Sequence, residues 1–152
     1  MKTIDELVRE LVDRDAIRDL PVRYCDCLRR KDVDGLLSLF TDDATFVMKG
    51  IEVEAVSRGR AEIRRMHEKA VAETNPRLFV HTQIMNPFGG DRATGRCCVE
   101  VRNVTITGVM ESLGLGYFED EYAKVGDHWK FTSRYHTFDG LDDKLYLRTF
   151  IA

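Results

Sequence analysis

The apolar positions of the first forty residues recur every three or four residues, which is the period of an α-helix. Pro21 is expected to bend this helix or to mark a restart, because proline has no amide hydrogen to donate. A short helix is predicted over residues 34–40 with Asp32 as its cap, and residues 41–43 are predicted to form a turn. The repeating apolar positions, with a polar break at residues 13–15, are Ile4, Leu7, Val8, Leu11, Ile17, Leu20, Tyr24 and Leu28.

From residue 44 the period changes from 3.6 to 2, which is typical of a strand. Ala44, Phe46 and Met48 alternate with more polar residues over positions 44–49, and residues 51–56 are the expected hairpin partner. Another helix is predicted to begin at Ser57 or Gly59, with His67 partly exposed on it. The inner side of that helix is expected to carry Ala61, Ile63, Met66, His67 and Ala70.

Four longer strands are predicted over residues 78–86, 94–107, 109–124 and 128–138, separated by glycine-containing turns. Helices kept apart from a run of strands indicate the α+β class. Long strands twist and curl, so we predict a cone-shaped, curved antiparallel sheet packed with the N-terminal helices. All 152 residues are assigned to one domain, whose interior pocket suits a small, largely apolar molecule.

Composition narrows the choice of partners. The chain has a net charge of −3, with 43% hydrophobic and 32% charged residues, which is typical of a soluble globular protein. No basic face stands out, so nucleic acid is not an expected partner. The apolar runs are too short to span a membrane, and residues 1–10 lack the features of a signal peptide. A cytoplasmic location is therefore predicted.

The cysteines and histidines predict neither disulfides nor a metal or cofactor site. Cys25 and Cys27 point apart on a helix, and Cys97 and Cys98 point to opposite faces of a strand. We interpret all four as reduced thiols, with Cys25–Cys97 the one pairing left open. The four histidines show no metal-ligand spacing, and no glycine-rich phosphate loop is present.

Several stretches resemble the SnoaL-like branch of the nuclear transport factor 2-like superfamily. The N-terminal match comprises residues 15–20, 23–24, 28, 32 and 39–46, and the late match comprises residues 117–122, 126 and 129–131. This resemblance implies a cone-shaped α+β barrel. It does not fix the activity, since the fold hosts dehydratases, dehydrohalogenases, isomerases, cyclases and binders without catalysis.

The most similar pattern is that of scytalone dehydratase, bile acid 7α-dehydratase and hexachlorocyclohexane dehydrochlorinase, which use a His–Asp dyad. The resemblance implies His81 as the base, with Tyr24 and Arg134 as polar pocket residues. The position of the dyad aspartate is occupied by Arg29, which would repel an imidazolium. Asp26 is a nearby substitute, although its place on the helix is more typical of a solvent-facing acid.

The alternation along the strands completes the expected site. His81 shares a face with Phe79, Gln83 and Met85, and Arg134 shares one with His136 and Phe138, opposite Trp129, Phe131, Ser133 and Tyr135. Each polar residue also has a structural interpretation: a hydrogen-bonded core histidine, an arginine paired with an acid, or a surface arginine at position 29. The predicted pocket residues are Leu28, Arg29, Phe46, Met48, Phe79, Met85, His136 and Phe138.

Three functions follow from these observations. The first is a cofactor-independent lyase or isomerase that acts on a small hydrophobic molecule, steroid- or polyketide-like, through His81, Tyr24, Arg134 and Asp26. The second is a binding protein that lacks the dyad. The third is an assembly subunit, which the apolar tail over residues 141–152 favours. A homo-oligomer, either a trimer or a dimer, is expected.

Overall fold

The computed structural model describes residues 1–50 and 54–141, so the predicted interface in the C-terminal tail lies almost wholly outside the described residues. The first element is α1 (Ile4–Arg30). Thr3 and Glu6 form a capping box at its N-terminus. Lys31, at φ 57°, ends it in the left-handed conformation. The predicted bend or restart at Pro21 does not divide the helix, which continues through that residue.

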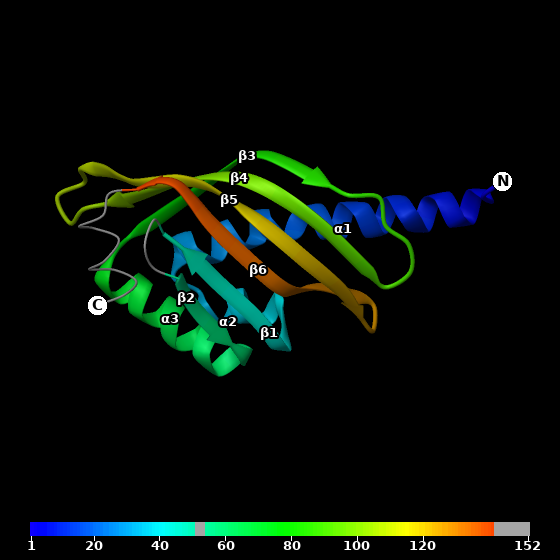
Figure 1. Cartoon of the computed structure of the whole chain (residues 1–152), viewed down its shortest axis with the longest axis horizontal. Coiled ribbons are helices and arrows are strands. Elements are labelled where there is room, and N and C mark those ends of the chain that lie inside the picture. Colours follow the sequence, from blue (N-terminus) through cyan, green and yellow to red (C-terminus); the bar gives the residue numbers. More distant parts are fainter. Residues whose placement is uncertain (51–53, 142–152) are drawn as a thin grey trace.

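The two halves of α1 turn their apolar residues in different directions. Ile17 is 1% exposed, whereas Ile4 is 80% exposed and the apolar residues that follow it are exposed too. Thirteen residues separate the two isoleucines, so they lie about 220° apart around the helix at 100° per residue. The predicted helical recurrence is present, but its apolar residues on the two sides of the polar break do not form one face. Figure 1 shows the N-terminal end of α1 extending beyond the sheet.

A second short helix, α2 (Val33–Ser38), is capped by Asp32 as predicted, because the Asp32 carboxylate accepts a hydrogen bond from the Gly35 amide at 2.8 Å. The predicted turn at residues 41–43 is wrong, since these residues lie within β1 (Phe40–Lys49). The strand is irregular there, and its pairing register shifts between Phe40 and Thr45. Ala44, Phe46 and Met48 are all buried, which confirms the predicted inner face.

The hairpin predicted after β1 is present, because β2 (Glu54–Arg58) pairs antiparallel with β1. Helix α3 (Gly59–Glu73) follows directly, and Gly59 adopts the φ of 75° that the sharp change of direction requires. Ile63, His67 and Ala70 form its buried side. Ala61 is exposed, so its predicted place on the inner side of α3 is wrong.

The remaining chain forms β3 (Pro76–Met85), β4 (Arg92–Val104), β5 (Met110–Val125) and β6 (His128–Leu141). These four strands form an antiparallel meander, and β1 joins it parallel to β6 to give the order β2-β1-β6-β5-β4-β3. The sheet is curved and remains open between its edge strands β2 and β3, and the helices pack across one face (Figure 1). The predicted α+β class and cone-like architecture are confirmed.

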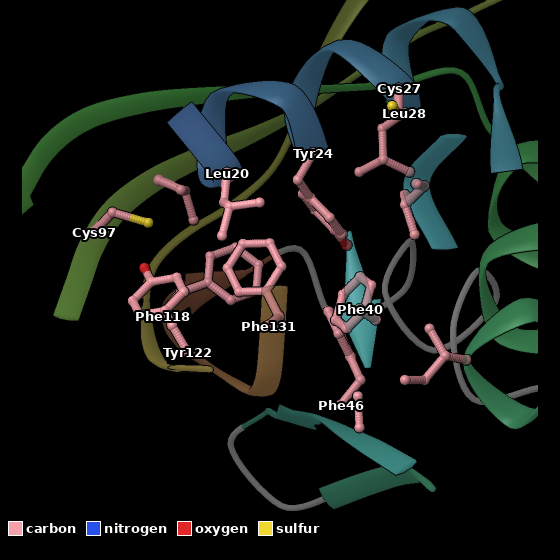
Figure 2. Close-up of a cluster of buried hydrophobic side chains, with 14 of the residues drawn as sticks. Leu20, Tyr24, Cys27, Leu28, Phe40, Phe46, Cys97, Phe118, Tyr122 and Phe131 are labelled. Carbon is pink, nitrogen blue, oxygen red and sulfur yellow. The ribbon is translucent and has the colours of Figure 1, made fainter. Parts of the chain in front are cut away.

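An aromatic core fills the space between α1 and the sheet. Tyr24, Phe40, Phe118 and Phe131 turn their rings toward one another beneath α1 (Figure 2). The rings of Tyr24 and Phe131 lie 6.5 Å apart between centroids. Although the interior is packed this tightly, open space remains to one side of the cluster, toward α3.

Candidate functional site

A cavity of about 30 Å³ lies where α1 and α3 face the inner side of the sheet. This volume has room for about one or two water molecules. Its wall is almost entirely apolar, and Met48 and Met66 are the flexible side chains in it. The lining residues are Tyr24, Leu28, Phe46, Met48, Met66, His67, Ala70, Pro76, Leu78, Val101, Phe118, His136 and Phe138.

Two of the three hydrogen-bonding side chains in this wall form a pair between helices. The Tyr24 hydroxyl on α1 lies 2.7 Å from Nε2 of His67 on α3. Nδ1 of His67 lies 2.8 Å from the carbonyl oxygen of Ile63, which can only accept. Nδ1 therefore carries the proton, Nε2 accepts, and Tyr24 donates. This chain fixes the tautomer of His67 and the direction of the Tyr24 hydroxyl.

The third polar side chain, His136, stands in a column of rings on the sheet. Its imidazole stacks on Phe118 and packs against Phe138, with both centroid distances 4.2 Å. The side chain is 3% exposed, and its Nε2 is buried without a hydrogen-bond partner among the described residues. A buried ring nitrogen in this state usually signals a ligand or an ordered water.

Both cavity histidines are neutral at pH 7. Burial lowers the pKa of His67 to about 4, against the opposing hydrogen bond to Ile63 and together with the charge of Arg134. Burial and the same arginine lower the pKa of His136 to about 3. Burial also raises the pKa of the Tyr24 phenol well above its ordinary value, which Arg134 offsets only in part. The part of the cavity wall that residues 1–50 and 54–141 form therefore carries hydrogen-bonding groups but no charge.

Arg134, predicted to be a polar pocket residue, is buried behind the wall. It forms a two-point ion pair with Asp120, with Nε–Oδ1 and Nη2–Oδ2 distances of 2.7 Å and 3.1 Å. Its guanidinium carbon lies 3.7 Å from the centroid of Phe118 and 4.3 Å from that of Phe131. Although burial lowers the pKa of Arg134, Asp120 holds it above its ordinary value, so the pair remains ionic.

The position of Phe131 beside Arg134 differs from the predicted alternation. Trp129 and Phe131 are buried with Arg134 rather than on the opposite face of the strand. The pairing of β5 with β6 explains this, because the register shifts between Glu121 and Tyr122 and leaves Thr132 as an extra residue in β6.

His81, the predicted base, lies on the outer face of the sheet, away from the cavity. Its Nε2 lies 3.1 Å from the Glu100 carboxylate, and its side chain is 55% exposed. His81 lies on the same face as Phe79, which precedes a bulge in β3 where the register with β4 shifts between Val80 and Thr82. One extra residue exchanges the two faces, so Gln83 points inward, where it donates to the Arg18 carbonyl oxygen at 3.1 Å.

The same bulge separates the other β3 residues assigned to the pocket. Phe79 is 46% exposed on the outer face and does not line the cavity. Met85 lies past the bulge, packed against the core but outside the cavity lining. Leu78, which precedes the bulge, lines the cavity instead.

The two charged residues of α1 that were predicted to belong to the site, Asp26 and Arg29, lie on its solvent side. Arg29 is exposed, so its assignment to the pocket is wrong and the surface interpretation holds. Asp26 is exposed as well and pairs with Arg30 at 3.0 Å. Because two residues turn a helix by about 200°, Asp26 points away from Tyr24, and no carboxylate of the residues that the structure describes lines the cavity.

His67 lies on the inner side of α3, as predicted, but is buried more deeply than predicted. It is 2% exposed rather than partly exposed. Its spacing of four residues from Ile63 and three from Ala70 is the helical signal that places it on this side. Its partner Tyr24 comes from another helix, which local spacing does not reveal.

The described residues hold no cluster of three or more potential metal ligands. Among the same residues, no helix is both long and apolar enough to cross a membrane. All four cysteines are free thiols. Burial raises the pKa of Cys25 to about 11 and that of Cys97 to about 12, so both are protonated at neutral pH.

The sequence profile of the SnoaL-like domain matches residues 9–135, which is most of the chain. The chain belongs to the SnoaL-like domain family. The predicted membership of the nuclear transport factor 2-like superfamily is thereby confirmed. No curated protein matches this SnoaL-like domain in sequence.

Solved structures share the whole architecture of this SnoaL-like domain. Rv3472 from Mycobacterium tuberculosis, of unknown function, is 26% identical with a TM-score of 0.78, over 91% of this chain and 78% of its own. A proposed aromatic-ring hydroxylase from Novosphingobium aromaticivorans is 26% identical with a TM-score of 0.75, over 86% and 91%. A proposed scytalone dehydratase from the same organism is 19% identical with a TM-score of 0.73, over 88% and 89%. At that identity the last likeness shows the fold alone.

Proposed function

We propose that this SnoaL-like domain binds a small, largely apolar molecule in the cavity between α1, α3 and the sheet. The observation that carries the proposal is the wall itself, in which apolar side chains surround Tyr24, His67 and His136. Binding sites for small molecules combine an apolar lining with a few oriented polar groups in this way. The cavity also lies where side chains from both long helices and five strands converge.

The cavity must widen to accept a ligand. A cavity of about 150 Å³ is needed to hold a benzene-sized molecule, against the 30 Å³ present. Met48 and Met66 can supply this space, because a methionine side chain has three rotatable bonds and repacks at low cost. Met66 is only partly buried on α3, so it lies at the outer end of the wall.

The catalytic alternative is a cofactor-independent lyase or isomerase reaction in the same cavity. It is supported by the hydroxyl–imidazole pair of Tyr24 and His67 and by the likeness in fold to a proposed scytalone dehydratase. His136 would be the proton acceptor there, in place of His81. Its low pKa makes it a weak base, and no carboxylate stabilises its protonated form. Binding is therefore the function that the geometry favours.

A cavity-filling variant tests the binding proposal. Ala70→Leu places a larger side chain in the cavity wall, whereas Ala61→Leu adds the same side chain at an exposed position of α3. We expect small apolar probes such as toluene and indole to raise the Tm of the wild type and of Ala61→Leu but not of Ala70→Leu. Equal stabilisation of a folded Ala70→Leu variant would exclude the cavity as the binding site.

We also propose that the chain self-associates through the exposed stripe of α1, defined by Ile4, Leu7, Val8, Leu11 and Val12. Each of these side chains is at least 47% exposed. The spacing of Ile4, Val8 and Leu11 fits the seam of a parallel helix pair.

Light scattering on a Leu7→Lys/Leu11→Lys variant tests this interface. We expect a lower mass than for the wild type, with Arg9→Gln on another side of α1 as the control. An unchanged mass for the lysine variant would exclude the stripe as the interface. A location in the reducing cytoplasm is proposed as well, supported by the four free thiols.

A further inference from the structure

We infer that the cavity selects a neutral, flat molecule carrying a hydroxyl group, and that Nε2 of His136 is the atom that binds this hydroxyl. The inference rests on the proposed binding function and adds the chemical class of the ligand. It also assigns the binding of the ligand hydroxyl to His136, which is neither at the dyad position nor part of the Tyr24–His67 pair.

The ring column of β5 and β6 holds the His136 nitrogen in place. The imidazole is inclined by 23° to Phe118 and by 38° to Phe138, so neighbouring rings restrict it on both sides. Its Nε2 has no partner among the described residues. A nitrogen that is buried, fixed and unpartnered loses its bonds to water when the chain folds, and a ligand can restore one of them.

The hydroxyl oxygen of Tyr24, the second wall group that can bind a ligand, favours a ligand that donates a hydrogen bond. Tyr24 already donates its proton to His67 at 2.7 Å, so its oxygen can only accept from a ligand. A hydroxyl can donate to either wall group and can accept if Nε2 of His136 carries a proton. A ketone or an ether can only accept and would leave Tyr24 without a donor.

Among the described residues no charged side chain lines the cavity, which disfavours charged ligands. Asp120 and Arg134 are paired with each other behind the ring column and do not line the cavity. Asp26 and Arg29 lie on the solvent side of α1. A carboxylate or phosphate would therefore lose its water without gaining a counter-charge, at a cost that few apolar contacts can offset.

The shape of the wall favours a flat ligand. The rings of Phe46 and Phe118, with centroids 6.1 Å apart, meet edge to face on one side of the cavity. His136 stacks face to face on Phe118, with 4.2 Å between the ring centroids, so the two rings lie in nearly parallel planes. An aromatic ring is flat and can pack edge to face against such rings, which a branched aliphatic molecule cannot do.

Calorimetric titration of the full chain with phenol, toluene and benzoate tests the inference, since the three probes share one ring and differ in polarity. We expect phenol to bind about tenfold more tightly than toluene, because one buried hydrogen bond separates them. Benzoate should not bind. His136→Phe preserves a ring in the column. The affinity of this variant for phenol should fall to its affinity for toluene, whereas its affinity for toluene should stay within about twofold of the wild-type value. His128→Phe, at an exposed position of β6, is the matched control.

The outcomes separate the inference from the proposed function. Equal binding of phenol and toluene to the wild type, or unchanged phenol binding in His136→Phe, would overturn the assignment of His136 and leave the binding function standing. No binding of either probe would overturn both. If His136→Phe does not fold, the imidazole ¹⁵N spectrum of the wild type decides: phenol, but not toluene, should shift the Nε2 signal of His136.

Discussion

Acidification from pH 7 to pH 5 is expected to destabilise this protein through its two buried histidines. His67 and His136 have folded-state pKa values of about 4 and about 3, against 6.5 for an unperturbed histidine. At pH 5 these two histidines are therefore protonated in the unfolded chain and neutral in the folded chain. Stability is fully present above pH 6.5 and falls as the pH drops toward the folded pKa values.

The size of this effect depends little on how far below 5 the folded pKa values lie. An unfolded histidine with a pKa of 6.5 is almost fully protonated at pH 5 and mostly neutral at pH 7. Linkage then gives about 2 kcal/mol for each histidine, or about 4 kcal/mol for the pair. This is a large part of the free energy of unfolding of an ordinary domain, which is roughly 5–15 kcal/mol.

Urea unfolding at pH 7 and pH 5 measures the loss directly. We expect about 4 kcal/mol for the wild type and about 2 kcal/mol for His136→Phe, which removes one of the two titrating groups. His128→Gln, at an exposed site, should behave as the wild type does. If His136→Phe loses as much stability as the wild type, His136 is not a buried neutral histidine and the reasoning is wrong.

Three substitutions test other parts of the structure by urea unfolding. Tyr24→Phe should cost about 1–3 kcal/mol, because it leaves Nε2 of His67 buried without a donor; an unchanged stability would contradict the hydrogen bond. Asp120→Asn should cost about 3–5 kcal/mol by leaving the Arg134 charge unpaired, and a loss below 1 kcal/mol would mean that water reaches the pair. Gly116→Ala should cost about 1–3 kcal/mol, since its Cβ would lie 2.1 Å from the Thr137 carbonyl oxygen. Gly89→Ala meets no atom within 4 Å and is the control; equal effects would contradict the tight β5–β6 approach.

The local periodicities determined most of the elements of this protein. A strand shows its two faces directly in its alternation, so Phe46 and Met48 were placed inside before any tertiary information. Asp32 was identified as a helix cap for a similar reason, since a cap bonds to an amide only three residues away. The run of helices followed by a run of strands was enough to predict the α+β class.

Only the tertiary structure decided which side chains meet in the cavity. A bulge is set by the neighbouring strand, and one extra residue after Val80 separated His81, which lies outside, from Gln83 and Met85, which lie inside. Tyr24 and His67 meet across 43 residues of sequence, and Arg134 finds its acid, Asp120, on the adjacent strand. Such contacts depend on how whole elements pack, which the spacing within one element does not encode. The sequence therefore determined the elements and most of their inner faces, whereas packing decided the polar groups that a ligand would meet.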